Sequence, residues 1–391
     1  MRKLLSIFLL FASSQVFGAY SYTRTVSVDH TKCGSASALS DFPVLVSISH
    51  TTFETVANGG HISNTVTQSG GNAVTMPADM IFTSDAGGTT KIPWEVESYD
   101  ASRGILVAWV KLSSIGCTVD TPFYVLYGDT GVTTQQNTGS YSPANVWDSN
   151  HLLVIHLPQQ GAGPDSTSNG NGISGGAGTL TPVAGIVANG LSMPGAGWDN
   201  TAASASLRTL GATTVETWVK FTATGSGENS MMIERDNDNL NWGITLELFN
   251  NNHAKFDAST GNDAPVIGGT ALATGTWYHL SGVYDGALEH LYVNGVEDAT
   301  ATSASGNIRS AAGASDYTFG DLGHANGRAT NGVLDEIRMS GSARSSNWLR
   351  TEYNNISSPG NIGADSFLKF GVEDARSIPT VRRRVITGGE Y

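Results

Sequence analysis

The amino-acid sequence predicts an all-β fold, and three features of the chain indicate it. Only 14% of the 391 residues are charged, and 47 glycines predict a large number of turns. The third feature is the segment 277–284, WYHLSGVY, in which two sets of residues alternate as they do along a half-buried strand. A turn at Asp285-Gly286, a return strand at 291–293 and the hairpin signal Asn294-Gly295 follow it. This stretch therefore predicts an antiparallel meander of three strands.

The chain begins with the pattern of a secretory signal peptide. Two basic residues, Arg2 and Lys3, precede an apolar run at 4–11, and small residues at Gly18 and Ala19 suit cleavage. The apolar run is short for a bilayer span, so we expect a signal peptide at 1–18, with a retained anchor as the alternative. We therefore expect a protein that is secreted or held at the cell surface.

The mature chain is expected to be strongly acidic. Loss of Arg2 and Lys3 removes two positive charges and takes the formal net charge from −13 to −15. Nucleic acid and anionic membranes do not attract such a surface, so neither is an expected partner, and solubility is its simplest role. No segment after the signal is long and apolar enough to insert into a membrane.

A first, sandwich-like β-domain is expected at residues 20–132. Clusters of Gly, Asp and Ser separate its candidate strands, which are 23–29, 42–49, 80–83, 92–99, 105–112 and 122–128. The two cysteines of the chain, Cys33 and Cys117, both fall within this domain. Because export places them in an oxidising compartment, we expect them to form a disulfide; two unpaired buried thiols are the alternative.

The rest of the chain is expected to form a linker, a second β-domain and a tail. The polar segment 133–146 reads as the linker, and the second domain is expected at 147–372. Residues 367–371 are expected to be its closing strand. Residues 373–391 read as a flexible tail, in which three consecutive arginines at 382–384 indicate attachment to an acidic partner or simply a solvated terminus.

Two blocks of the second domain resemble the laminin-G-like module of the concanavalin A-like jelly rolls. The first is the meander at 277–295, and the second is GVLDEIR at 332–338 followed by Ala343-Arg344-Ser345 and Trp348. The resemblance extends over residues 147–353 and implies a jelly-roll sandwich, a fold that hosts lectins, hydrolases and adhesive modules alike. In the first domain, the motifs at 81–83, 94–100, 106–110 and 124–128 resemble a domain of unknown function that commonly precedes this module in secreted bacterial and archaeal proteins.

Motifs for catalysis are missing from the sequence. Glucanases built on this sandwich use Glu-x-Asp-x-x-Glu on one strand, whereas Glu95 and Glu97 lack the third carboxylate and the acidic residues at 234–238 read as a turn. Residues 83–89 resemble a single sialidase-type Asp-box, which predicts only a hairpin. No Gly-x-Ser-x-Gly or His-Glu-x-x-His motif occurs. We therefore expect that the protein is not an enzyme, with a carbohydrate-active enzyme as one alternative.

A calcium site is expected in the second domain. The loop 165–172, DSTSNGNG, is rich in side-chain oxygens and glycines, which suit the coordination of calcium. Similar jelly rolls join such a loop to the acidic start of the last strand, and this resemblance implies Asp165, Asn169 and Asp335 as the ligands. The alternative is an Asx-type turn without a metal ion.

Sugar-binding sandwiches present exposed aromatic residues beside amides and carboxylates, because a pyranose has an apolar face and a polar edge. Several residues near turns have this character, with packing in a turn or the core as the alternative for each. The candidate ligand-binding residues are Trp198, Trp242, His324, Asn326 and Arg328, and Tyr317 lies in a similar context. By contrast, Trp218, Trp277 and Trp348 fall on strand or helix patterns and are expected in the core.

The sequence as a whole predicts a secreted, non-catalytic binding or adhesion protein. Its expected partner is a carbohydrate or another surface ligand that the second domain binds, with calcium in a structural role. A structural subunit of a cell-surface or virion-like assembly is the main alternative, because a jelly roll also packs against copies of itself.

Overall fold

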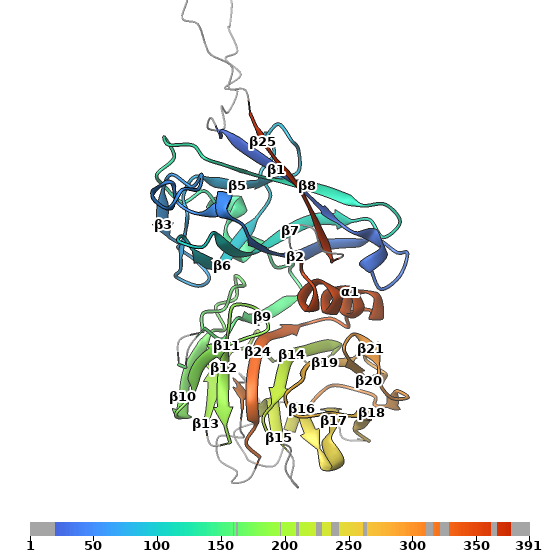
Figure 1. The fold of residues 1–391 in the computed structure, drawn as a ribbon. Coiled ribbons are helices and arrows are strands. Elements are labelled where there is room, and N and C mark those ends of the chain that lie inside the picture. Colours follow the sequence, from blue (N-terminus) through green and yellow to red (C-terminus); the bar gives the residue numbers. More distant parts are fainter. Residues whose placement is uncertain are drawn as a thin grey trace, which may run out of the picture.

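The structure is a computed structural model, and it confirms the all-β fold. It describes residues 20–158, 160–161, 163–195, 197–208, 211–223, 229–235, 242–260, 264–309, 316–320, 328–360 and 366–376. The predicted signal peptide and the arginines of the tail lie outside the described residues. Two β-domains meet end to end, with helix α1 at their junction (Figure 1).

The first domain contains a four-stranded sheet in the order β25-β1-β8-β5 and a three-stranded sheet in the order β2-β7-β6. Its strands are β1 (Tyr22–Val28), β2 (Leu39–Ser49), β5 (Met80–Thr83), β6 (Trp94–Asp100), β7 (Ile105–Ile115), β8 (Thr121–Tyr127) and β25 (Leu368–Ala375), with a separate hairpin of β3 (Thr65–Thr67) and β4 (Thr75–Pro77). All six predicted strands are present. The apolar residues between the sheets, among them Phe82, Trp94 and Phe123, are fully buried and form the core.

The last strand corrects the predicted domain organisation. Residues 367–371 do not close the second domain, because β25 pairs with β1 of the first domain, where Phe370 lies opposite Val26. Phe367 and Leu368 are buried in the core of the first domain. The strand also extends to Ala375, into the predicted tail. It covers the free edge of β1, an edge that would otherwise expose unpaired backbone groups.

The predicted linker 133–146 is folded against the first domain. It contains two short 3₁₀ helices, η4 (Gly139–Tyr141) and η5 (Pro143–Asn145). Asn137 is fully buried, and its side-chain amide donates hydrogen bonds to the Trp94 carbonyl and the Gln68 side chain, each at 3.0 Å. These bonds fix the position from which the second domain begins.

The second domain is a sandwich of two antiparallel sheets. One has the order β10-β13-β23-β15-β16-β17-β18, and the other has the order β11-β12-β24-β14-β19-β20-β21, with β9 paired to β24 and β22 paired to β20. Its strands are β9 (His151–Ile155), β10 (Ile173–Gly178), β11 (Thr181–Ala184), β12 (Asn189–Pro194), β13 (Gly197–Thr201), β14 (Thr213–Phe221), β15 (Asn229–Arg235), β16 (Trp242–Phe249), β17 (His253–Ala258), β18 (Val266–Ala271), β19 (Trp277–Tyr284), β20 (Leu288–Val293), β21 (Val296–Glu297), β22 (Thr302–Ser303), β23 (Asp316–Phe319) and β24 (Asn331–Ser340).

The predicted meander is confirmed as β19, β20 and β21. Asn294 and Gly295 connect the last two strands with φ angles of 54° and 69°, the left-handed geometry that a two-residue hairpin requires. The inward residues of these strands, Leu280, Tyr284 and Leu291, contribute to the core between the two sheets.

Helix α1 (Ser346–Ser357) joins the two domains. Ser345 caps its N-terminus by accepting a hydrogen bond from the Trp348 backbone N–H. The helix then docks on the first domain, where Asn355 accepts a hydrogen bond from the Leu45 N–H at 3.1 Å. A side chain at Gly34 would clash with the helix, since its Cβ would lie 2.7 Å from the Arg350 Cβ. Apolar residues of both domains form common clusters here, so the junction is a continuous core.

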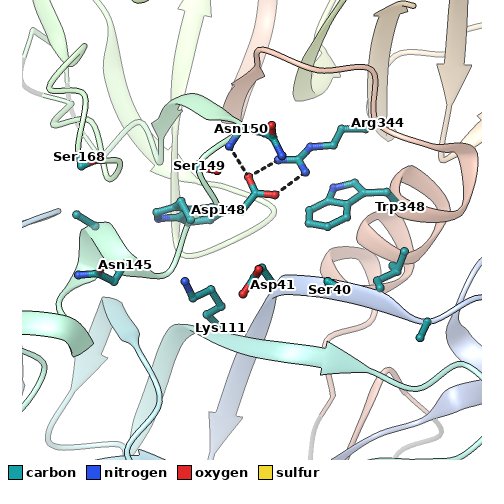
Figure 2. A pocket seen from close by; sticks show the side chains of 14 residues that line it. Ser40, Asp41, Lys111, Asn145, Asp148, Ser149, Asn150, Ser168, Arg344 and Trp348 are labelled. Carbon is teal, nitrogen blue, oxygen red and sulfur yellow. Dashed lines mark hydrogen bonds and ion pairs between the residues drawn. The ribbon is translucent and has the colours of Figure 1, made fainter.

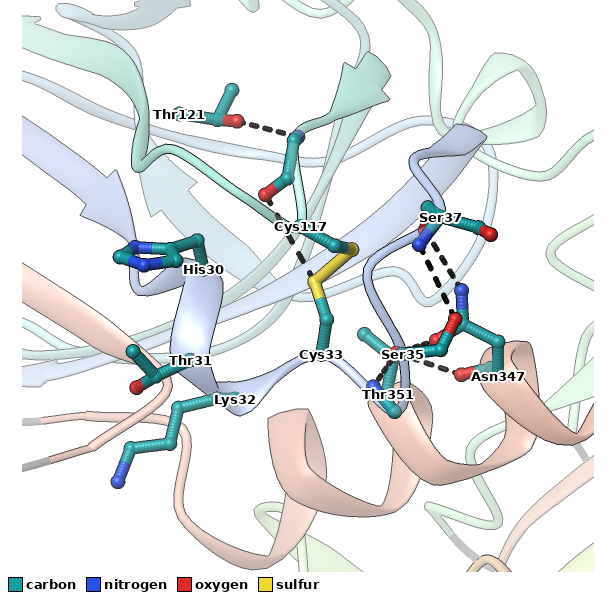
Figure 3. Close-up of a disulfide and its surroundings, with 12 residues drawn as sticks. His30, Thr31, Lys32, Cys33, Ser35, Ser37, Cys117, Thr121, Asn347 and Thr351 are labelled. Carbon is teal, nitrogen blue, oxygen red and sulfur yellow. Dashed lines mark hydrogen bonds between the residues drawn. A yellow bond between two sulfur atoms is a disulfide. The ribbon is translucent and has the colours of Figure 1, made fainter.

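The predicted disulfide is present beside this junction (Figure 3). It joins Cys33 to Cys117 across 84 residues, with the Cα atoms 5.6 Å apart. The loop that carries Cys33 also contacts α1, because the Gly34 N–H donates to the Thr351 hydroxyl at 2.9 Å. The bond therefore fixes a loop of the first domain on which the helix rests. Among the described residues, no helix has the length and apolar character of a membrane span.

Candidate ligand site between the domains

A cleft of about 690 Å³ opens at the junction of the two domains (Figure 2). The first domain contributes the start of β2 and one side chain of β7, and the second contributes the segment before β9 and the start of α1. Most of the lining side chains carry hydrogen-bonding groups, among them Ser40, Asp41, Lys111, Asn145, Asp148 and Asn150. Two indole rings, Trp147 and Trp348, lie in its wall and are 4% and 6% exposed.

One wall of the cleft is held rigid by a buried ion pair. Arg344 donates two hydrogen bonds to Asp148, one to each carboxylate oxygen, and both measure 2.7 Å. The guanidinium also lies over the Trp348 ring, 4.2 Å from its centroid. Burial raises the pKa of Asp148, but the hydrogen bonds from Arg344 and His151 lower it more and hold it well below its ordinary value. The pair therefore stays charged and fixes this side of the cleft.

Two charged groups on the opposite side of the cleft are free to bind a ligand. Within the described part of the chain, Lys111 and Asp41 form no side-chain hydrogen bond or ion pair. Both side chains point into the cleft in Figure 2. The site therefore offers a free cationic donor and a free anionic acceptor opposite a fixed ion pair.

His151 lies beneath the cleft and makes stability depend on pH. Its side chain is 1% exposed, and burial together with the Arg344 charge lowers the pKa of His151 to about 4. The pKa of His151 in the folded protein is below the unfolded value of about 6.5. The contribution of neutral His151 to the free energy of unfolding is therefore complete above about pH 6.5 and is lost as the pH falls through 4.

We therefore expect the stability advantage of the wild type over His151→Gln to shrink by about 3 kcal/mol between pH 7 and pH 4. Urea unfolding of both proteins across this range measures the difference, and the packing cost of the substitution cancels because it is present at every pH. A pH-independent difference would contradict the prediction.

A second group of ionisable side chains is buried deeper at the junction. Glu95 and Glu97 come from β6, and Glu336 and Arg338 come from β24. All four are buried, and His156 lies among them. Burial, opposed by the charge of His156 and reinforced by that of Glu336, raises the pKa of Glu97 to about 8. A smaller pocket of about 280 Å³ has Glu97 and His156 in its wall.

Among the described side chains, the predicted ligand-binding residues Trp198 and Arg328 do not line the cleft. Trp198 lies half-buried on β13, and Trp242 begins β16. Arg328 is near Glu247, with 3.8 Å between its Nη1 and the Glu247 Oε2. His324 and Asn326 fall outside the described residues. Tyr317, in contrast, is fully buried in the core, as are Trp218 and, almost fully, Trp348.

The three predicted calcium ligands have other partners. Asp165 accepts hydrogen bonds from the backbone N–H groups of Val154, Thr167 and Asn171, and the Asn169 amide donates to the His151 carbonyl. Asp335 accepts from three other N–H groups, those of Ile186, Val187 and Glu336. The Asp165 loop thus has the Asx-type geometry of the alternative interpretation. Calcium binding by Asp165, Asn169 and Asp335 stays a prediction.

The cleft residues escaped sequence analysis because they come from distant segments. Asp148 and Arg344 are 196 residues apart in the chain, and Lys111 sits on an ordinary strand of the other domain. The only local signals were Trp147-Asp148 at the start of the second domain and Ala343-Arg344-Ser345 after its last strand. Neither indicates a site without the partner segment.

Comparison with known proteins identifies the class of the second domain. Residues 195–350 match the family described as the concanavalin A-like lectin/glucanases superfamily. This match agrees with the two-sheet sandwich and confirms the jelly-roll prediction. A search of the curated proteins gave no match.

Several solved structures are similar to part of the chain. Domain 4 of AbnA, an extracellular arabinanase from Geobacillus stearothermophilus in complex with arabinotriose, is 18% identical, with 52% of this chain and 98% of that chain covered and a TM-score of 0.42. The binding domain of Paraclostridial Mosquitocidal Protein 1 is 12% identical, with 52% of each chain covered and a TM-score of 0.43. The binding domain of botulinum neurotoxin serotype G is 12% identical, with 52% and 50% covered and a TM-score of 0.41. The present chain thus spans about half the length of the two toxin domains.

Proposed function

We propose that this protein is an exported, non-catalytic binding or adhesion protein that takes a carbohydrate in the cleft between its domains. The observation that carries the proposal is the lining of this cleft, in which Lys111 and Asp41 have no side-chain partner among the described residues while Asp148 and Arg344 are fixed. A volume of about 690 Å³ is in the range of small-molecule sites and would hold a short oligosaccharide.

The chemistry of the lining favours a sugar over an apolar ligand. Each sugar hydroxyl both donates and accepts hydrogen bonds, and the cleft supplies ammonium, amide, hydroxyl and carboxylate groups at close range. The edges of Trp147 and Trp348 add a small apolar surface. The membership of the second domain in a superfamily that includes lectins agrees with this role.

The same lining supports a binding role over hydrolysis. A glycosidase requires one carboxyl group that donates a proton and a second that acts as base or nucleophile. The carboxylates that line this cleft are Asp41 and Asp148, and the latter is held ionised in its bidentate pair with Arg344. Asp148 is therefore unsuited to donate a proton. The disulfide between Cys33 and Cys117 agrees with export to an oxidising compartment.

A glycan array probed with the mature protein tests the proposal, followed by calorimetry with the best glycan. We expect Lys111→Ala to weaken binding about tenfold or more, because a charge-assisted hydrogen bond contributes about 1.5–3 kcal/mol. Asp41→Ala should weaken it as well. Lys220→Ala is the control, since Lys220 lies over the Trp277 ring and does not line the cleft.

Unchanged affinity in both Lys111→Ala and Asp41→Ala would show that the glycan binds elsewhere in the protein. No binding to any glycan would contradict the carbohydrate assignment. Release of sugar from the bound glycan, abolished by Asp41→Asn, would favour the enzyme.

A further inference from the structure

Three buried side chains from both domains converge below the smaller pocket. Glu97 belongs to the first domain, whereas His156 and Glu336 belong to the second. The His156 Nδ1 lies 2.6 Å from the Glu336 Oε1 and 3.4 Å from the Glu97 Oε2. One nitrogen and two carboxylate oxygens thus lie within 4.8 Å of one another.

A β-bulge lies at each of the two carboxylate residues, Glu97 and Glu336, and places both side chains near His156. Val96 lies opposite Ala108 and Ser98 lies opposite Val107, so Glu97 is an extra residue, a β-bulge in β6. A second bulge lies in β24, where Glu336 adopts a φ of 51°. Such a φ is unfavourable for a residue with a side chain, and the packing around Glu336 has to maintain it.

Each of the two carboxylates is oriented by a further partner. The Trp109 indole N–H donates to the Glu97 Oε2 at 2.8 Å, and the Arg338 Nη2 donates to the Glu336 Oε2 at 2.5 Å. The second ring nitrogen of His156 lies 3.6 Å from the Glu95 Oε2, beyond hydrogen-bond distance. Metal ligands in proteins are commonly oriented by outer partners such as those of Glu97 and Glu336.

Two buried polar atoms of the group have no hydrogen-bond partner among the described residues. They are the Glu97 Oε1 and the His156 Nε2, on side chains that are 3% and 1% exposed. An unsatisfied buried polar atom is costly, so a missing bound species is the simplest explanation for the Glu97 Oε1. The His156 Nε2 faces Glu95, on the other side of the ring from Glu97 and Glu336. The pocket of about 280 Å³ has Glu97 and His156 in its wall, so open space lies beside two of the three side chains.

We propose that Glu97, His156 and Glu336 bind one divalent first-row transition-metal ion, of the zinc class, at the junction of the two domains. One imidazole and two carboxylates suit zinc, whereas calcium requires six to eight oxygen ligands. The ion replaces the proton between the His156 Nδ1 and the Glu336 Oε1, so binding releases a proton. Because Glu97 comes from the other domain, the ion ties the two domains together.

Zinc binding to the full mature protein tests this site. After treatment with EDTA and dialysis, we expect calorimetry with zinc chloride to show one equivalent per chain, and the melting temperature to rise with zinc. Glu97→Gln and His156→Gln should each weaken the affinity by at least about a hundredfold. The matched control is His30→Gln in the partly buried group Asp29, His30 and Asp120, which should leave the binding unchanged.

A second measurement keeps the test valid if a variant fails to fold. Cobalt added to the metal-free wild type should give the visible absorption bands of a site with mixed nitrogen and oxygen ligands. No zinc binding by the wild type at micromolar concentration would overturn the proposal. Binding of calcium without zinc would overturn it too, as would a loss of zinc binding in His30→Gln alone.

Discussion

Replacing Arg338 with methionine is expected to lower the free energy of unfolding by about 3–5 kcal/mol. The Arg338 guanidinium is buried and pairs with both Glu336 and Glu352, and it lies over the Trp109 ring, 4.5 Å from the centroid. Methionine fills most of the volume but removes the guanidinium from two buried carboxylates, of which Glu336 keeps His156 as a partner. The cost of those uncompensated charges, more than the lost attraction, sets the size of the effect.

Urea unfolding followed by tryptophan fluorescence measures this loss. The matched control is Arg103→Met, because Arg103 also pairs with a carboxylate, that of Asp100, but its side chain is 70% exposed. We expect the control to change stability by less than about 1 kcal/mol. A further change of Glu352 to leucine in the Arg338 variant should restore part of the loss, since it removes one of the stranded charges. A loss below about 1 kcal/mol in Arg338→Met would contradict the prediction. It would show that the carboxylates of Glu336 and Glu352 are hydrated or already protonated.

Removing the disulfide is expected to lower the stability of the first domain strongly. Cys33 and Cys117 close a loop over a sequence separation of 84 residues. Chain entropy alone predicts that the bond contributes about 4–5 kcal/mol, because the reduced unfolded chain has many more conformations. The loop at Cys33 also supports α1, so its loss should loosen the contact between the domains.

Differential scanning calorimetry of the wild type and the Cys33→Ala/Cys117→Ala variant tests this expectation. The melting temperature of the variant should fall and should no longer respond to a reducing agent, whereas that of the wild type should fall when the agent is added. Intact-mass analysis of the native protein without reductant should show no free thiol. Equal melting temperatures for the two proteins, or free alkylation of both cysteines in the wild type, would contradict the prediction.

The sequence by itself determined the features that depend on neighbouring residues. Alternation at 277–284 and the pair Asn294-Gly295 predicted the meander, and the structure shows β19, β20 and β21 there. The pairing of Cys33 with Cys117 was also predictable, because a chain with two cysteines has one possible intramolecular bond and the sequence led us to expect export. The meander was predictable because a turn and a strand period have local physical causes, and the disulfide because two cysteines allow only one pairing within the chain.

The partners of each element were decided only by the tertiary structure. Residues 367–371 read as a strand, but nothing in their pattern shows that the free edge lies on β1 in the other domain. Glu95 and Glu97 read as an incomplete acidic motif, since His156 and Glu336 reach them through long-range strand pairing and two β-bulges. The cleft likewise exists only where the two domains meet. Sequence periodicity specifies which face of a strand is buried, whereas side-chain packing over the whole chain specifies what that face meets.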